Sequence, residues 1–242
     1  MSNVFLATSL ITLAERSTGC TDEQEEECEG EVFGFRPSSL ITIIGTISGL
    51  MAAFFLPIIG AIVDYTKYRK ATYTTIATAS MVIQAIQIGT VEATWFPMAI
   101  LQAINGFFYS ALAVAANAYQ PEIVREVGEE LYTVYSARYY VWMFGMQAFY
   151  LVIVVGVTTF LGADDVVTAQ FGQGIDVVVS GFFYYISVYY FTRKEPKRTL
   201  ENGQSLVLAG IKQVATTTMN IAKHYPSTLG RFLIAVLFGQ AG

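Results

Sequence analysis

Five long stretches of this chain carry almost no charge, and this property limits what the chain can fold into. Three of them contain no charged residue, a fourth contains only Arg138 and the fifth only Asp176. The stretches are 38–63, 71–91, 93–119, 134–161 and 172–192. Segments that cross lipid must satisfy their backbone groups internally, so they are helices or barrel strands. Barrel strands are about 10 residues long and alternate in polarity, whereas these stretches are longer and do not alternate. We therefore predict an all-α integral membrane protein with five full membrane helices.

Composition supports this class. Of the 242 residues, 54% are hydrophobic and 14% are charged, whereas soluble domains carry about 25% charged residues. The formal net charge of −5 arises in an acidic run within 22–31, so it gives no sign of a nucleic-acid partner. The sequence has no phosphate-binding glycine loop, metal-ligand cluster or catalytic triad pattern. We therefore expect no enzyme activity, no cofactor and no metal.

Basic residues fall on every second connector between the stretches. The basic connectors are 64–70, 120–133 and 193–198, and those without Lys or Arg are 91–93 and 162–171. Lys and Arg concentrate on cytoplasmic loops, so we predict that the basic connectors are cytoplasmic. The acidic loop 17–37 then lies on the opposite, lumenal side.

Two cysteines, Cys20 and Cys28, bracket the acidic run of that loop. If the loop faces an oxidising compartment, they can close a small disulfide loop. The other interpretation is two free thiols. Their spacing matches no metal-binding motif.

The two ends of the chain and the long connector give three further expectations. Residues 1–16 hold a short apolar run without a basic leader, which we interpret as a partial first membrane helix. An apolar run from 229 to 242 predicts the truncated start of the next membrane helix. The connector 193–228 carries an apolar stripe at helical spacing, formed by Val207, Ile211, Val214 and Ile221. This stripe predicts an amphipathic helix, either on the cytoplasmic membrane face or packed on the protein itself.

The motif with the most chemical content begins near the end of the first full stretch. Gly60 and Asp64 are one helical turn apart, and Arg69 and Lys70 follow. A glycine permits close approach of another helix, and an Asp can accept hydrogen bonds from a helix N-terminus. Arg69 and Lys70 can pair with acids or lipid phosphates. Together these four residues predict a polar latch, or gating motif, that holds one conformation. The alternative is that the basic residues only set the topology and Gly60 only packs.

The pattern Gly-x-x-x-Asp-x-x-x-x-Arg-Lys at 60–70 resembles the loop motif between the second and third helices of the major facilitator superfamily. Ser38-Ser39-Leu40, residues 57–65 and residues 117–123 are similar to its vacuole effluxer branch, which is related to the autophagy vacuolar amino-acid exporters. The resemblance covers roughly residues 38–198. The sequence departs from the superfamily motif at Lys67, where a second glycine is usual, and at Tyr65, where a basic residue is usual.

This resemblance implies a fold and a function. The fold is the six-helix N-terminal bundle of a major facilitator-type transporter, with a partial first helix and the start of a seventh. The function is secondary active transport of small solutes by alternating access, with amino-acid efflux from a vacuole-like compartment as the implied case. The implied partners are membrane lipids, the solute and a missing C-terminal six-helix half. A vacuolar or other endomembrane is the implied location, rather than the plasma membrane.

Polar side chains inside the stretches are candidates for lining a solute path. Gln102, Asn105 and Tyr109 follow i, i+3, i+7 on one helix face, and Asn117 and Gln147 stand singly. Such groups line a water-filled path or bond neighbouring helices, and the sequence leaves both readings open.

The two charges inside the stretches, Arg138 and Asp176, are expected within one or two turns of a helix end. Side chains near a helix end can reach the interface, which accounts for both charges. A role in proton coupling is the alternative for Asp176. We expect no carboxylate at the centre of a stretch. The alternative function for the whole chain is a truncated or repurposed transporter half that serves as a structural subunit of a membrane complex.

Overall fold

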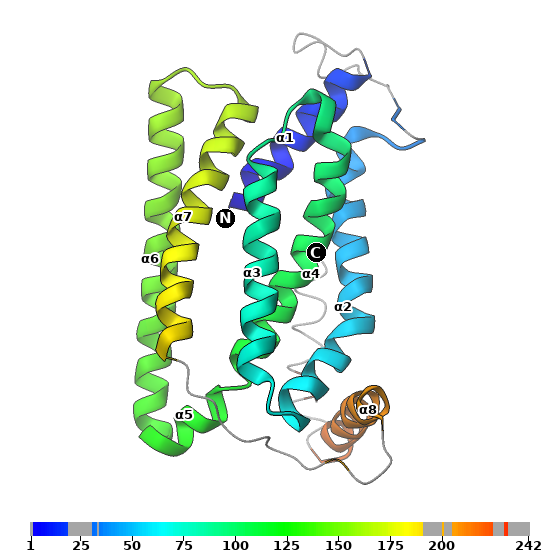
Figure 1. Ribbon diagram of the computed structural model, residues 1–242, viewed down its shortest axis with the longest axis vertical. Coiled ribbons are helices and arrows are strands. Elements are labelled where there is room, and N and C mark those ends of the chain that lie inside the picture. Colours follow the sequence, from blue (N-terminus) through cyan, green and yellow to red (C-terminus); the bar gives the residue numbers. More distant parts are fainter. Residues whose placement is uncertain are drawn as a thin grey trace.

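The computed structural model describes residues 2–18, 31–32, 34–190, 200, 205–224 and 230–231. The helices, in chain order, are α1 (Ser2–Ser17), α2 (Leu40–Tyr65), α3 (Arg69–Gln87), α4 (Trp95–Asn117), α5 (Gln120–Val127), α6 (Glu129–Phe160), α7 (Asp165–Tyr190) and α8 (Leu206–His224). Short 3-10 turns, η2 (Pro37–Ser39) and η3 (Glu92–Thr94), precede α2 and α4. The long helices run side by side along one axis, and α8 lies across the lower end of α2 (Figure 1).

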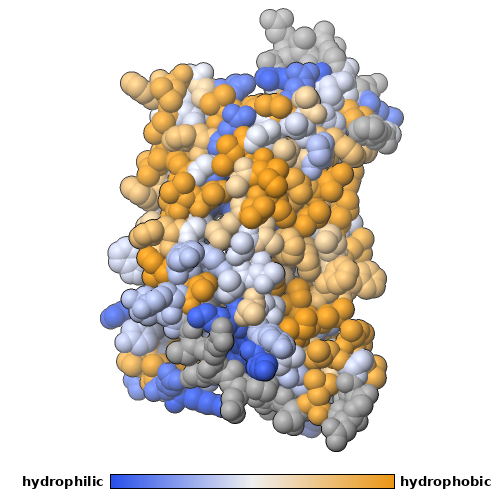
Figure 2. All heavy atoms as spheres, in the orientation of Figure 1, coloured by the Kyte–Doolittle hydropathy of each residue, from blue (hydrophilic) through white to orange (hydrophobic). Residues whose placement is uncertain are grey.

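The surface of this bundle is apolar where a soluble protein would be polar. Phe54 is 74% exposed and Phe160 is 89% exposed. In Figure 2, hydrophobic side chains gather over the upper middle and the right side of the face, and hydrophilic ones are more common in its lower part. Four helical segments are long and apolar enough to cross a membrane: Pro37–Tyr65, Glu92–Val127, Glu129–Phe160 and Asp165–Tyr190. Large exposed apolar surfaces mark membrane contact, so the predicted all-α membrane bundle is confirmed.

The predicted span 71–91 corresponds to α3, which is not among those four segments. The helix has 19 residues and is rich in Thr, Ser and Gln. It packs against both α4 and α7 (Figure 1), so many of its polar side chains face other helices. That α3 crosses the membrane stays a prediction.

The connector predicted at 120–133 contains a helix that the apolar pattern did not indicate. α5 starts beside Pro121, a residue that suits the first turn of a helix, and ends at Gly128, whose φ is +82°. A positive φ favours glycine, so Gly128 separates α5 from α6. α6 then begins at Glu129, earlier than the predicted start at 134.

α7 also begins earlier than predicted, at Asp165 instead of 172. The backbone N–H of Val167 donates to Asp164 Oδ1 at 2.9 Å, which is the N-cap arrangement that fixes the start of a helix. Asp176 therefore lies ~17 Å along the axis of α7 at the usual rise per residue, near the middle of the helix. The expectation that Asp176 sits close to a helix end is wrong, because the polar first turns of α7 belong to the helix.

Successive helix connections alternate between the two ends of the bundle (Figure 1). The connector 66–68, α5 and α8 lie at one end, here called the basic end. The connectors 88–94 and 161–164 lie at the other, the opposite end. Which end faces the cytoplasm stays a prediction. Cys20 and Cys28, and most of 193–204 and 229–242, lie outside the described residues.

Of the two clusters of buried hydrophobic residues found in the described part of the chain, the larger lies at the opposite end. Leu6, Leu10 and Leu13 of α1 are almost fully buried and join a cluster with Trp95 and Met98 of α4. α1 also packs closely along α7. α1 therefore packs against both α4 and α7 at this end of the bundle.

Candidate functional site

The gating motif predicted at 60–70 borders a groove at the basic end. Gly60 and Asp64 line it from the last turns of α2, Val114 lines it from α4, and Gly210 and Gln213 line it from α8. The groove encloses about 360 Å³. A Cβ built on Gly60 would meet nothing within 4 Å, so the described helices leave open space beside this glycine.

Asp64 has a specific partner in this groove. The side-chain amide of Gln213 donates from Nε2 to Asp64 Oδ2 at 3.0 Å. The sequence predicted that Asp64 would accept from a neighbouring helix N-terminus, whereas the structure gives it a glutamine in the middle of α8. The carboxylate therefore joins a long membrane helix to the helix in the connector.

α8 docks on α2 through a narrow face. A Cβ on Gly210 would lie 2.3 Å from the backbone oxygen of Pro57, so only glycine allows this approach. Ala209 and Gly210 are buried, whereas Val207, Ile211 and Val214 of the predicted apolar stripe are 45%, 54% and 50% exposed. Hence the helix packs on the protein with its small residues and leaves much of its apolar stripe uncovered.

Arg69 is a deeply buried charge at the basic end, with 3% exposure. Its guanidinium forms an ion pair with Glu122 of α5 and donates from Nε to the backbone oxygen of Val63 at 3.2 Å. The guanidinium also stacks over the ring of Tyr119, 5.3 Å from the ring centroid. These contacts join the end of α2, the start of α3 and α5. Neither Glu122 nor Tyr119 was identified from the sequence as a partner of Arg69, although both lie within residues 117–123, which carry the family resemblance.

Lys70, the last residue of the gating motif, is half-buried in the first turn of α3. Its backbone oxygen accepts from Thr74 Oγ1 at 2.8 Å. Lys67 lies over the ring of Tyr68, 5.8 Å from the centroid. The three basic residues of this connector thus occupy different surroundings, and only Arg69 is deeply buried.

The residues proposed to line a solute path separate into two environments. Gln102 and Asn105 are buried, with 7% and 1% exposure. Gln102 Oε1 accepts from Gln87 Nε2 at 3.0 Å, and Asn105 Oδ1 accepts from Ser80 Oγ at 2.6 Å. Both bonds join α4 to α3. Tyr109, by contrast, is 68% exposed, so it does not share their surroundings.

The other two candidate residues lie apart from this pair. Asn117 is exposed at the end of α4, and its Oδ1 accepts from Gln120 Nε2 at 2.9 Å. Gln147 is half-buried on α6. The structure therefore does not gather the five candidates around one described cavity.

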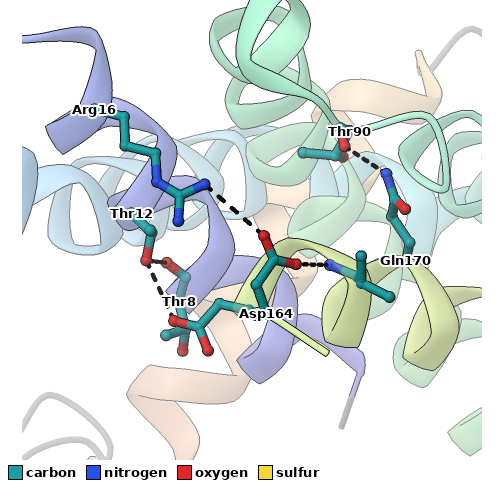
Figure 3. A network of polar contacts seen from close by, with 8 residues as sticks. Thr8, Thr12, Arg16, Thr90, Asp164 and Gln170 are labelled. Atoms are coloured by element: carbon teal, nitrogen blue, oxygen red, sulfur yellow. Dashed lines mark hydrogen bonds and ion pairs between the residues drawn. The ribbon is translucent and has the colours of Figure 1, made fainter. Parts of the chain in front are cut away.

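A second polar cluster ties the helices together at the opposite end, and Figure 3 shows it. Arg16 of α1 lies 3.9 Å from Asp164, and Thr12 Oγ1 donates to Asp165 Oδ2 at 3.4 Å. Gln170 Nε2 donates to the backbone oxygen of Thr90 at 2.8 Å. These contacts connect α1, the turn after α3 and the start of α7. Asp164 and Asp165 precede an apolar run, which is a signal for the start of a helix. Their partners on α1, Arg16 and Thr12, could not be predicted from spacing along the sequence.

The fold and these contacts define a multi-pass helical membrane protein whose polar side chains join helices at both ends of an apolar bundle. A family model described as vacuole effluxer Atg22-like matches residues 3–242. The chain belongs to this family, a vacuolar efflux transporter family of the major facilitator type, and is therefore a multi-pass endomembrane protein. No curated protein and no solved structure matches the chain.

Proposed function

We propose that this chain supplies the N-terminal bundle of a secondary active transporter that exports small solutes, amino acids in particular, from a vacuole-like compartment by alternating access. The observation that carries the proposal is the bond between Asp64 and Gln213 in the groove at the end of α2. This bond joins Asp64, a residue of the proposed gating motif, to a helix of the connector, which supports a gate between the two. Family membership supplies the transport class.

In this proposal the basic end faces the cytoplasm and the groove acts as a gate. Asp64 holds α8 in one access state through Gln213. In the other state, the carboxylate bonds the N-terminus of a helix from a C-terminal six-helix half, where the helix dipole favours an anion. The open space beside Gly60 supports this exchange, because it leaves room for a further helix to approach.

Arg69 and Glu122 form the fixed side of this gate. Their buried pair joins α2, α3 and α5, so the basic end of the bundle moves as a unit when α8 moves. A two-state gate of this kind needs rigid elements on either side of the bond that breaks.

In this proposal the solute contacts the exposed candidate residues directly. Tyr109 and Asn117 present exposed polar groups on α4, and Gln147 lies half-buried on α6. Gln102 and Asn105 hold α4 against α3, which makes them positioning residues for that path.

Counterflow tests the proposal. Full-length protein is reconstituted into liposomes that are loaded with one unlabelled amino acid, and uptake of the labelled form is followed across a panel of amino acids. Saturable uptake above that of protein-free liposomes is expected for at least one of them. If none exchanges while the protein is folded and inserted, the transport proposal fails and a structural subunit of a membrane complex becomes the better reading.

A further inference from the structure

α8 presents two opposite faces, and α2 covers one of them. On the covered side, Gly210 lies against the backbone oxygen of Pro57, and Gln213 donates to Asp64. On the other side, apolar residues recur every three or four positions, which is the spacing of one helix face. This outer face consists of Leu208, Ile211, Ala215, Met219 and Ala222. At about 100° of rotation per residue, it points away from α2.

The outer face is exposed along its whole length. Leu208 is 58% exposed, Ile211 is 54% exposed and Met219 is 65% exposed, and both alanines of this face are exposed as well. The contacts that hold α8 come from α2, which touches the opposite side of the helix. An apolar patch of this kind marks contact with a membrane or with another protein, so the outer face calls for a partner.

The depth of α8 along the bundle indicates what that partner is. α8 lies across the lower end of α2 (Figure 1), and its contacts there include Pro57 and Asp64. Pro57 is ~12 Å along the helix axis from the end of α2 at Tyr65. The whole of α2 is ~39 Å long at the usual rise per residue, whereas the hydrocarbon core of a bilayer is ~30 Å thick. α8 therefore lies at the level where hydrocarbon meets the lipid headgroups.

The charges of α8 match the charge of a lipid surface. Lys212 and Lys223 are exposed and lie about three turns apart along one edge of the outer face. α8 contains no Asp or Glu, and the preceding residues 193–198 hold four basic residues against one acid. A lysine can lay its stem along apolar surface and keep its ammonium group at a phosphate. Each lysine near an anionic surface strengthens binding by about fivefold.

We propose that the outer face of α8 binds the surface of the surrounding membrane, with its large apolar side chains among the upper acyl chains and its two lysines at anionic headgroups. The lipid boundary at this depth offers apolar surface and negative charge together, which suits a helix of this pattern. A protein partner at the same face would have to supply acids for both lysines. α8 is thus held from two sides, by α2 through Gly210 and Gln213 and by lipid through its outer face.

Photo-crosslinking in nanodiscs identifies what touches the outer face. In the full-length protein, a photo-crosslinking amino acid replaces either Ile211 or, as the matched control, Thr216, which is exposed on the same helix about 140° around its axis from Ile211. The nanodiscs contain phosphatidylcholine mixed with phosphatidylserine, and mass spectrometry identifies the products. We expect lipid adducts at 211 and few at 216. Crosslinks from 211 to the rest of the chain or to a second copy, no lipid adduct at 211, or equal lipid yields at both positions overturn the proposal.

Hydrogen exchange tests the part played by the headgroups. Exchange of the amides in 206–224 reports local opening of α8, and it is compared in nanodiscs with and without phosphatidylserine. For the wild type we expect phosphatidylserine to slow exchange about tenfold. The double variant Lys212→Gln/Lys223→Gln should lose most of this effect. Lys67→Gln/Arg125→Gln, which removes two exposed positive charges outside α8, should keep it. No effect of phosphatidylserine on the wild type, or equal effects on the wild type and Lys212→Gln/Lys223→Gln, overturns the proposal.

The inference rests on the proposed function in one respect: if α8 is part of the gate, the lipid surface regulates that gate, because it favours the state in which Gln213 bonds Asp64. Counterflow by the wild type should then differ at least about threefold between liposomes with and without phosphatidylserine, and Lys212→Gln/Lys223→Gln should abolish the difference. Absence of counterflow in both lipids would overturn the proposed function and leave the crosslinking and exchange results standing. Equal counterflow in both lipids, with exchange that still depends on phosphatidylserine, would overturn the regulatory role.

Discussion

Gln213 of α8 donates its side-chain amide to the Asp64 carboxylate of α2 at 3.0 Å, across 149 positions of the chain. Beside this bond, Gly210 contacts the backbone of Pro57 so closely that no other residue type fits. Two contacts of different kinds thus fix one connector helix against one membrane helix. A substitution at Asp64 can therefore weaken the hydrogen bond while the backbone contact at Gly210 still holds α8 against α2.

Asp64→Asn should slow transport by the full-length protein more than it lowers the amount of folded protein. The substitution removes the charge that strengthens the bond to Gln213 and keeps the side-chain size. A change of about 1.4 kcal/mol in the balance of two access states alters their ratio about tenfold. We expect transport to fall about tenfold and folded abundance to change by less than about twofold. Counterflow rate and size-exclusion yield, measured on the same preparations, give the two quantities.

The control for this variant acts on the partner. Gln213→Leu removes the same bond from the other side and should shift transport in the same direction. Gln213→Glu places two carboxylates together and should have the larger effect. Equal losses of transport and abundance in Asp64→Asn would count against a gating role.

The sequence predicted the membrane helices because their signal is local. Long uncharged stretches specify spanning helices by composition alone, and α2 and α4 follow them closely. Gly60 and Asp64 were also found from spacing, and both line one groove. Spacing along the sequence could not identify the partner residue in each contact, such as Gln213 for Asp64 or Glu122 for Arg69. Those partners come from distant parts of the chain.

The errors have physical reasons as well. The start of α7 was placed too late because Asp164 and Asp165 were read as a loop, whereas Asp164 is the N-cap of the helix. That error moved Asp176 to a helix end and hid its central position. The stripe from Gln102 to Tyr109 was read as one face, but Tyr109 is exposed while Gln102 bonds α3. The spacing of residues in the sequence indicates the direction in which a side chain points around the helix axis. It does not show which neighbouring helix lies in that direction.

Gly210→Ala should release α8 from α2. The added Cβ would lie 2.3 Å from the Pro57 oxygen, and overpacking of this kind costs about 1–3 kcal/mol. Hydrogen exchange of the amides in 206–224 should become faster, and the Asp64–Gln213 bond should be lost with the docking. Gly145→Ala on α6 is the matched control, because its Cβ meets nothing within 4 Å. Unchanged exchange in Gly210→Ala would contradict this docking geometry.

Arg69→Ala should destabilise the bundle strongly. It leaves the Glu122 carboxylate without its ion-pair partner and removes the bond to Val63, and loss of one member of a buried pair costs about 3–5 kcal/mol. We expect about 3 kcal/mol, because the side chain of Glu122 retains 15% exposure. Thermal unfolding in detergent measures the loss.

Two further variants interpret that result. Arg69→Lys should recover only part of the stability, because lysine lacks the planar set of donors that reaches two acceptors. Lys67→Ala changes an exposed residue of the same connector and should stay within about 0.5 kcal/mol of the wild type. A loss in Lys67→Ala as large as that in Arg69→Ala would show that net charge, and not the buried pair, sets the stability.

Asp164 has two roles that substitution can separate. It caps α7 through the N–H of Val167 at 2.9 Å, and it pairs with Arg16 at 3.9 Å (Figure 3). The pair is partly solvent-exposed, with side-chain exposures of 34% and 49%, and such pairs contribute about 0–1 kcal/mol. Asp164→Asn keeps an N-cap acceptor and should cost less than about 0.5 kcal/mol, whereas Asp164→Ala also removes the cap and should cost about 1 kcal/mol more. Thermal unfolding at low and high salt distinguishes them, because salt screens only the ion pair. If Asp164→Asn costs as much as Asp164→Ala at low salt and nothing at high salt, the ion pair with Arg16 is the dominant contribution and the cap is secondary.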